Sequence, residues 1–541
     1  MIETAEAMVK CLELEGVKVV FGYPGAAICP FYDYIYKSNK IRHILVRQEQ
    51  NGGHSANGYA RITGKPAVCI ATSGPGATNL ITAIATAYAD SIPLVVITGQ
   101  VNTDQIGRDV FQEADITGSA EPFVKHSYLV KDATQLPRII KEAFYIAGTG
   151  RNGPVLIDVP MDIQKVMIDF EYPDSVDIIS YNPTTKGNGL QIKRVVEAIE
   201  QSEKPLICVG GGVFSAKAQK ELFDFANTFD IPVVSTMMGI GAIQGDDRLY
   251  MGMIGTHGKK LANQTMNECD LLILIGARVG DRAVNQPNNL AKTTKIVHID
   301  IDPAEIGKNI PANIPLVGDA KKILVKLIEN MKEHGCKKFT NWLDSLNDKK
   351  LPLEFAKTPK GTINPKLFMK KLSDKAPSNT IVVADVGQNQ IWTANGFKVK
   401  NGRFLTSCGM GTMGYSVPAS IGVKLAKPEA PVIAVCGDGS FQMSFMELAT
   451  AVQHNVNIKV IVMVNYRLGM VCELQHNQYE SREMAVNLDG SPDFVKLAEA
   501  YGIPSMRVDD DSQIDDAIDR LFNEKGIFLL ECDVAPNETT L

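Results

Sequence analysis

The stretch "VCGDGSFQMSFMELATAVQHNVNIKVIVMVN", residues 435–465, puts polar residues at the ends of two apolar runs. The first run ends in Gly-Asp-Gly around Asp438, and the second ends in a lone Asn465, with a helical pattern between them. The carboxyl ends of neighbouring parallel strands meet at one edge of a sheet, where ligands bind. We therefore expect both side chains to face the same ligand.

The residue types around this edge suit a metal-bound diphosphate. Gly437 and Gly439 allow a tight turn and a close approach of the backbone. The helix that follows offers free N–H groups to an anion. A carboxylate and an amide oxygen are hard ligands suited to Mg²⁺. The alternative is a plain helix start, with Asp438 as N-cap and Asn465 as a turn residue; an Asn at the end of the very next strand favours the metal site.

Similar apolar runs recur along the chain and predict the fold class. They are continuous and rich in β-branched residues, which is typical of strands buried on both faces in parallel sheets. We predict an α/β protein with three doubly wound parallel-sheet domains. The runs cover residues 65–76, 92–100, 153–160, 204–212, 269–278, 294–302, 379–388, 430–439 and 458–465.

Two polar, Pro-containing stretches without periodicity, residues 171–188 and 346–364, read as linkers. The predicted domains are therefore residues 1–170, 186–345 and 362–541. Residues 72–99, in the first domain, give a Gly-rich loop, a helix and a strand, which is the order seen in the third domain. This indicates one architecture used twice.

Composition restricts the function classes. The formal net charge of −6 and the absence of a long Lys/Arg run argue against nucleic acid or an anionic membrane as a partner. No apolar segment is long enough to span a bilayer, and the N-terminus lacks a signal-peptide pattern. Ten scattered Cys suit a reducing cytoplasm, and eight His without ligand spacing predict no zinc site.

Many short stretches resemble the catalytic subunit of acetohydroxyacid synthase (acetolactate synthase), a family of thiamin diphosphate (ThDP) enzymes. Gly-Asp-Gly followed by Asn is similar to the ThDP motif of that superfamily. The other matching stretches are "FGYPGA", "NGYAR", "TSGPGATN", "DSIPLVVITGQV", "DVFQEADI", "VKHSYLV", "GPVLIDVP", "HIDIDPAEIGKN", "DVGQNQIW", "GMGTMGYSVPASIG" and "GDGSFQMSFMELATAV".

The resemblance implies catalytic roles for three residues of the first domain. Glu49 would donate a hydrogen bond to N1′ of the cofactor pyrimidine, and a carboxyl group in apolar surroundings keeps the proton that this role needs. Phe111 and Gln112 would line the substrate side of the thiazolium. Without the resemblance, Glu49 would read as a solvent-facing helix start and Gln112 as a surface residue.

The resemblance also implies the ThDP and Mg²⁺ residues of the third domain. The carbonyl of Gly411 would meet the 4′-amino group, and Met413 would hold the cofactor bent, although a lone Met is usually core filler. Asp438, Asn465 and the carbonyl of Arg467 would bind Mg²⁺. Further implied cofactor residues are Gly387, Gln388, Gln390, Gly437, Gly439, Ser440, Leu468, Gly469 and Met470.

For the middle domain the resemblance implies FAD, bound for structure and not for redox chemistry. The alternative is an empty structural domain, because a Gly-rich loop after a strand is weak evidence alone. The implied dinucleotide residues are Gly210, Gly211, Arg278, Asp281 and Asp300. The family also implies a homodimer or dimer of dimers, with Glu49 of one subunit facing the diphosphate site of its neighbour, and a possible regulatory subunit.

The positions that meet the acceptor substrate depart from the family pattern, as does the end of the sequence, which lacks the family's longer tail. The departures are at Asp104, Met161, Thr256, Gly280 and Leu474. We expect decarboxylation of pyruvate and transfer of the two-carbon unit to a second 2-keto acid. One alternative is another acceptor, such as an aldehyde or a keto-sugar nucleotide. Another is a non-catalytic cofactor-binding paralogue, against which intact Glu49, Asp438 and Asn465 argue.

Overall fold

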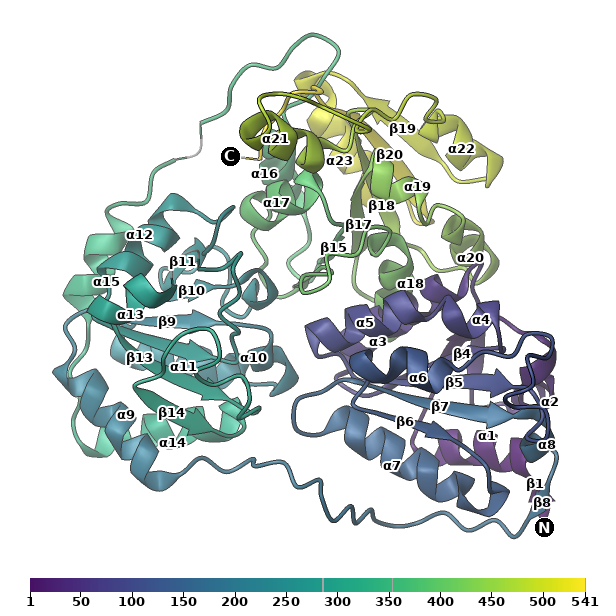
Figure 1. Ribbon diagram of the computed structural model, residues 1–541. Helices are drawn as coiled ribbons and strands as arrows, with labels where there is room; N and C mark the ends of the chain where they lie inside the picture. Colours follow the sequence, from purple (N-terminus) through teal and green to yellow (C-terminus); the bar gives the residue numbers. More distant parts are fainter. Residues whose placement is uncertain (285–286, 353, 541) are drawn as a thin grey trace.

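Three six-stranded parallel sheets form the frame of the protein (Figure 1), in a computed structural model that describes residues 1–284, 287–352 and 354–540. The expected fold class is confirmed. Each sheet is built from one of three successive parts of the chain, although the domain boundaries given above stay predictions.

The first and third sheets share one strand order. Counted from the first strand of each sheet, the order is 2-1-3-4-6-5 in both, which supports one architecture used twice. The first sheet runs β3(Arg42–Leu45), β2(Val19–Gly22), β4(Ala67–Ala71), β5(Leu94–Gln100), β7(Pro154–Pro160), β6(His126–Leu129). The third runs β16(Arg403–Leu405), β15(Ile381–Ala384), β17(Val432–Gly437), β18(Lys459–Val464), β20(Phe528–Asp533), β19(Ser505–Val508).

The middle sheet has a different order, 3-2-1-4-5-6, which is that of dinucleotide-binding folds. It runs β11(Tyr250–Met253), β10(Val233–Ser235), β9(Pro205–Val209), β12(Leu271–Ile275), β13(Lys295–Asp300), β14(Ile314–Val317). A separate antiparallel pair, β1(Ile2–Glu3) and β8(Met167–Ile168), joins the start of the chain to the end of the first domain.

Helices connect the strands throughout. Those of the first domain are α1(Thr4–Leu14), α2(Cys29–Lys37), α3(Glu49–Thr63), α4(Pro75–Thr78), α5(Ile81–Asp90), α6(Ile116–Ala120), α7(Leu136–Gly148) and α8(Met161–Gln164). Those of the middle domain are α9(Gly189–Gln201), α10(Gly212–Ser215), α11(Gln219–Phe229), α12(Lys260–Glu268), α13(Pro287–Thr293), α14(Ala320–Glu333) and α15(Thr340–Asn347). Those of the third are α16(Pro365–Lys375), α17(Gln388–Gly396), α18(Ser416–Ala426), α19(Asp438–Gln442), α20(Glu447–Gln453), α21(Gly469–Gln478), α22(Phe494–Ala500) and α23(Ile514–Asn523).

The nine apolar runs all form strands, and these strands are buried on both faces. In β5, Val95 and Ile97 belong to one apolar cluster, while Leu94 and Val96 belong to another. Successive side chains of a strand point to opposite faces, so helices cover both sides of the sheet. β17 alternates between two clusters in the same way.

The first and third domains meet through α3 and α18 (Figure 1). The two helices approach closely because glycine stands at the crossing. A Cβ on Gly422 would lie 1.8 Å from the carbonyl oxygen of Ser55, and one on Gly58 would lie 2.1 Å from that of Ala419. A larger residue at either position would force the two domains apart.

Within the described residues, no helix is long and apolar enough to cross a membrane. All ten cysteines lie in the described part of the chain and are free thiols.

Candidate functional site

The opening stretch folds so that Asp438 and Asn465 meet. β17 and β18 are neighbours in the third sheet, joined by α19 and α20. Oδ2 of Asp438 accepts the main-chain N–H of Asn465 at 3.2 Å and that of Tyr466 at 2.6 Å. Both residues therefore stand at the carboxyl edge of the sheet, where a ligand would bind.

The side chain of Asp438 is buried. It is 2% exposed, and burial raises the pKa of its carboxyl to about 6, although bonds from main-chain N–H groups oppose this rise. Its Oδ1 accepts the N–H of Gly439 at 2.9 Å. Each carboxylate oxygen can accept a second bond, so a cation can still coordinate Asp438 at this edge.

The ligand set fits Mg²⁺ better than a transition metal. Oδ1 of Asn465 accepts the N–H of Arg467 at 3.1 Å, so the amide oxygen and the turn at Arg467 lie together. One carboxylate, one amide oxygen and one main-chain carbonyl are hard oxygen donors. Within the ranges that the structure describes, no cluster of three or more His, Cys, Asp or Glu could hold a metal.

Glycines at the surrounding turns allow the chain to pack closely around Asp438 and Asn465. Ser440 caps α19 through the N–H of Gly437, at 3.1 Å. Gly387 caps α17 with φ 140°, a conformation that favours glycine. A Cβ on Gly439 would lie 2.8 Å from a methyl of Leu468, and one on Gly469 would lie 2.0 Å from Oε1 of Gln388.

Gln388 connects this edge to the end of the described chain. Its Oε1 accepts Nδ2 of Asn465 at 3.3 Å. Its Nε2 donates to Oε2 of Glu473 at 3.0 Å and to the carbonyl of Glu538 at 2.7 Å. Gln390 points elsewhere, since its Nε2 donates to Oγ1 of Thr406 at 2.6 Å.

The loop that carries Gly411 and Met413 is held on two sides. Gly411 is exposed with φ 65°, and the methyl of Met413 would lie 3.7 Å from a Cβ on Gly439, so Met413 reaches toward the sheet edge that carries Asp438. From within the third domain, buried Asp385 accepts the N–H groups of Gly414 and Ser416, at 2.9 and 2.7 Å.

The second anchor of this loop comes from the first domain. Asp90, at the end of α5, accepts the N–H of Gly409 at 2.7 Å and that of Cys408 at 3.2 Å. It also pairs with Arg61 at 2.6 Å, and both side chains are almost completely buried. The loop geometry therefore depends on both domains.

Glu49 is the first residue of α3 and is half-buried in the single chain. Its Oε2 accepts Nδ2 of Asn79 at 3.0 Å. The apolar surroundings expected for this carboxyl are therefore incomplete within one chain. Phe111 is 87% exposed, and neighbouring Gln112 has φ 58°, in the loop between β5 and α6.

A cavity of about 1260 Å³ joins the middle domain to the other two. The expected dinucleotide residues all line it, with four expected ThDP residues: Gly210, Gly211, Arg278, Asp281, Asp300, Gly387, Gln390, Gly411 and Met470. Among the described residues that line it, Glu49, Phe111 and Gln112 are absent. The cavity thus brings the middle-domain residues together with four residues of the third domain, whereas Asp438, Asn465 and Arg467 do not line it, and neither do the three residues of the first domain.

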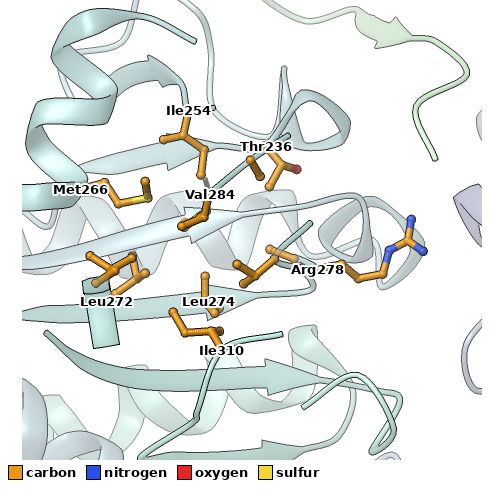
Figure 2. Close-up of a pocket in the computed structure, with 13 residues that line it drawn as sticks. Thr236, Ile254, Met266, Leu272, Leu274, Arg278, Val284 and Ile310 are labelled. Carbon is orange, nitrogen blue, oxygen red and sulfur yellow. The ribbon is translucent and has the colours of Figure 1, made fainter. Parts of the chain in front are cut away.

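Charged groups of the middle domain differ in their setting at this cavity. Arg278 donates to the carbonyl of Ala89 at 2.5 Å, so it ties the middle domain to α5. Asp281 is largely exposed, whereas burial raises the pKa of Asp300 to about 6. An apolar void of about 10 Å³ lies beside the cavity and is too small for a cofactor; the Arg278 side chain points away from it (Figure 2).

The positions that depart from the family pattern fall into two groups. Thr256, Gly280 and Leu474 line the cavity, and a Cβ on Gly280 would meet nothing within 4 Å. Asp104 and Met161 lie in the first domain, where Asp104 is exposed and Met161 begins α8.

Sequence reasoning missed Asp385 and the Arg61–Asp90 pair. Asp385 follows β15 directly, as Asp438 follows β17, so an acid after a buried strand was the available signal. Asp90 stands in an otherwise apolar region, residues 80–99. Its partners Cys408 and Gly409 are more than 300 residues away in the sequence, and no local sequence pattern predicts these contacts.

Comparison with known families matches all three domains. The models match the thiamine pyrophosphate enzyme N-terminal TPP binding domain over residues 2–119, the central domain over 192–327 and the C-terminal TPP binding domain over 385–532.

Similar proteins cover almost the whole chain. A probable acetolactate synthase large subunit of Methanocaldococcus jannaschii is 46% identical, over 99% of this chain and 92% of its own. An acetolactate synthase large subunit of Haemophilus influenzae is 42% identical, over 96% and 92%. An acetolactate synthase of Arthrospira platensis is 43% identical, over 99% and 94%.

Proposed function

Because this chain belongs to the acetolactate synthase family of thiamine pyrophosphate enzymes, we propose that it decarboxylates pyruvate and joins the two-carbon unit to a second 2-keto acid. The observation that carries this proposal is the meeting of Asp438 and Asn465 at one sheet edge, beside the loop of Gly411 and Met413. Bound ThDP would supply the nucleophilic carbon and the electron sink for decarboxylation.

The residues of the third domain would hold the cofactor. Asp438, Asn465 and the carbonyl of Arg467 would bind Mg²⁺, which takes diphosphate oxygens and water in its remaining positions. N–H groups at the start of α19 and the turn after β18 would face the diphosphate. Gly411 would accept a bond from the 4′-amino group through its carbonyl, and Met413 would support the bent cofactor.

Glu49 would act across a subunit interface. It lies outside the three-domain cavity, and Phe111 in the same domain is almost fully exposed. In a homodimer, Glu49 of one subunit would hold its proton at N1′ of the cofactor bound to the other, and Phe111 and Gln112 would line the substrate side.

The three-domain cavity supports FAD. Its size suits a dinucleotide, the middle sheet has the dinucleotide-binding strand order, and the Gly-rich turn after β9 reaches its wall at Gly210 and Gly211. FAD would hold the middle domain against the other two and would take no part in redox chemistry. Several relatives are named "large subunit", which supports a smaller regulatory partner for this chain.

The test is product analysis. The purified chain is incubated with pyruvate, ThDP and Mg²⁺, with and without 2-ketobutyrate, and the products are identified by mass spectrometry. We expect 2-acetolactate from pyruvate alone. Carbon dioxide with only acetaldehyde would show that a keto acid is not the acceptor and would favour an aldehyde or keto-sugar acceptor. No turnover despite bound ThDP would favour the non-catalytic alternative.

A further inference from the structure

Glu447 is a buried acid of the opening stretch to which the proposed chemistry gives no role. It begins α20, on the crossover between the two strands that end at Asp438 and Asn465. Its side chain is 0% exposed. α20 lies against the first domain (Figure 1), so the carboxylate sits at the boundary between two domains of one chain.

The carboxylate of Glu447 accepts hydrogen bonds from the turn that carries Glu49. Its Oε1 accepts the main-chain N–H of Arg47 at 3.0 Å and Nδ2 of Asn51, also at 3.0 Å. These two donors stand two residues before and two residues after Glu49. A single oxygen atom of the third domain thus fixes both sides of the helix start from which Glu49 projects.

The second oxygen is used within its own helix. Oε2 of Glu447 accepts Oγ1 of Thr450 at 2.6 Å. Burial of the group raises the pKa of this carboxyl, while the bonds from Thr450, Arg47 and Asn51 oppose the rise. Every oxygen therefore has a partner, as a buried acid requires.

Docking of the two domains does not itself need this acid. His454, at the other end of α20, accepts the N–H of Leu45 at 3.0 Å, and its carbonyl accepts Arg42 at 2.7 Å. The close contact of α3 with α18 also joins the domains. Burying a carboxylate costs free energy. In return, the carboxylate of Glu447 fixes the position of residues 47–51.

We infer that Glu447 is a positioning residue for Glu49. It acts through the Arg47 amide and the Asn51 side chain, and it acts as a hydrogen-bond acceptor without transferring a proton. The inference rests on the proposed role of Glu49. It extends that role because Glu447 connects two sites of the same subunit. One is the proposed diphosphate site of its third domain, and the other is Glu49, which would enter the active site of the neighbouring subunit.

The acceptor role predicts which substitutions are tolerated. In Glu447→Gln, the amide oxygen can still accept from Arg47 and Asn51, and the new NH₂ group can donate to Oγ1 of Thr450. Glu447→Ala leaves both donors buried without a partner. Thr450→Val is the comparison variant: it leaves both bonds to Oε1 of Glu447 intact, and it removes the bond to Oε2 and the bond that Oγ1 of Thr450 donates to the carbonyl of Leu45 at 3.3 Å.

Two measurements test the inference. In the cofactor-free protein, hydrogen exchange with mass spectrometry follows the Arg47 amide in a peptide spanning residues 45–53. In the holoenzyme with ThDP and Mg²⁺, NMR follows deuterium exchange at C2 of the cofactor, which reports the action of Glu49. In Glu447→Ala we expect faster amide exchange and C2 exchange slowed by about 10²-fold, the effect of a misplacement of ~1 Å. Glu447→Gln should behave like the native chain, and Thr450→Val should slow C2 exchange less than Glu447→Ala does, because the Arg47 and Asn51 bonds remain.

The same measurements separate the possible failures. Normal C2 exchange in Glu447→Ala overturns the inference, and slow exchange in Glu447→Gln shows a proton-transfer role instead. In the Glu49→Gln background, Glu447→Ala should slow C2 exchange no further; an additive effect would mean a general structural role. If Glu447→Ala does not fold, Asn51→Ala removes one of the two bonds and should give a smaller slowing. Normal C2 exchange in Glu49→Gln alone would instead overturn the proposed role of Glu49.

Discussion

In a single chain, the carboxyl group of Glu49 is only partly enclosed by other residues. Its carboxyl is half-buried and receives one side-chain hydrogen bond, from Asn79. An acid that must hold a proton near neutral pH needs surroundings with less water. Under the proposed function, the third domain of a neighbouring subunit completes those surroundings.

Glu49→Gln tests that role most directly. The amide keeps the size of the side chain but cannot supply an acidic proton at N1′. We expect ThDP to bind normally and pyruvate turnover to fall by about 10²–10⁴-fold, the usual loss when one positioned proton-transfer group is removed. Calorimetry gives the binding, and a coupled assay gives the rate. Unchanged turnover would remove Glu49 from the mechanism.

We expect Leu474, at the wall of the cavity, to influence the acceptor preference. It is 45% exposed, and it is one of the departures given above: the resemblance to the family implies a Trp at this position. A contact with one extra methylene is worth about 1–3 kcal/mol, or 10- to 200-fold. We expect weak discrimination between pyruvate and 2-ketobutyrate in the native chain, and a rise in 2-ketobutyrate preference in Leu474→Trp. Competition between the two keto acids measures this, and a strong native preference would show that another residue forms the wall.

The roles of single residues could be predicted where these residues directly follow a strand. Asp438 and Asn465 were found because each ends an apolar run. Asp385, Asp90 and Glu447 hold loops of the site through bonds that span 29 to 400 residues of sequence. Such partners depend on how the domains pack, which no local pattern encodes.

At the scale of elements, the pairing of β5 with β7 buries an acid close to the loop between β5 and α6. Asp158 is 1% exposed, and its oxygens accept Oγ1 of Thr98 at 2.7 Å and Nε2 of Gln100 at 2.9 Å. Gln100 also donates to the carbonyl of Ala114, at 2.8 Å. This network holds the loop that carries Phe111 and Gln112.

This network should make stability depend on pH. Burial raises the pKa of Asp158 to about 7 in the folded chain, whereas an unfolded Asp has a pKa of about 4. Between these values the folded state binds more protons, so this group lowers the free energy of unfolding as pH rises, by about 1.4 kcal/mol per unit at most. Asp158→Asn removes this titration, so it should raise the melting temperature at pH 8 relative to the melting temperature at pH 5. Exposed Asp374→Asn is the control and should leave the pH dependence of the melting temperature unchanged.

The buried Arg61–Asp90 pair couples α3 and α5 to the loop before α18. Asp90→Ala leaves a buried guanidinium unpaired, at a cost of about 3–5 kcal/mol, and removes two anchors of the loop. We expect a lower melting temperature and weaker ThDP binding by calorimetry. Asp374→Ala breaks an exposed pair, worth about 1 kcal/mol or less, and should change neither. A lower melting temperature with native ThDP affinity would show that Asp385 holds the loop alone.

The elements that could be predicted were those covered on both faces. Central strands such as β4, β5 and β17 read as continuous apolar runs because both faces are buried. The edge strands β6 and β19 are half-exposed, with sequences that carry no such run. β16 has three residues and was missed for its length.

For the whole molecule, the decisive question is whether an active site draws on two subunits. Glu49→Gln and Asp438→Ala are each expected to inactivate the enzyme. In a mixed dimer, one site would combine the native Glu49 of one chain with the native Asp438 of the other. Mixing and reassociating the two variants should restore roughly a quarter of the native activity, since half of randomly formed dimers are hybrid and each has one complete site.

The control is each variant reassociated with itself, which should stay inactive. A site built within one chain would leave the mixture inactive as well, because every chain would carry a defect. Sedimentation of the mixture confirms that hybrid dimers are present before activity is measured.

The crossing of α3 with α18 has a consequence for synthesis at the ribosome. Ser55 meets Pro418, which is 363 residues later in the chain. At ~5–20 residues per second, the first domain waits about 20 to 70 s before its covering helix exists. During that time the glycine-lined face of α3 is open to water and to other nascent chains.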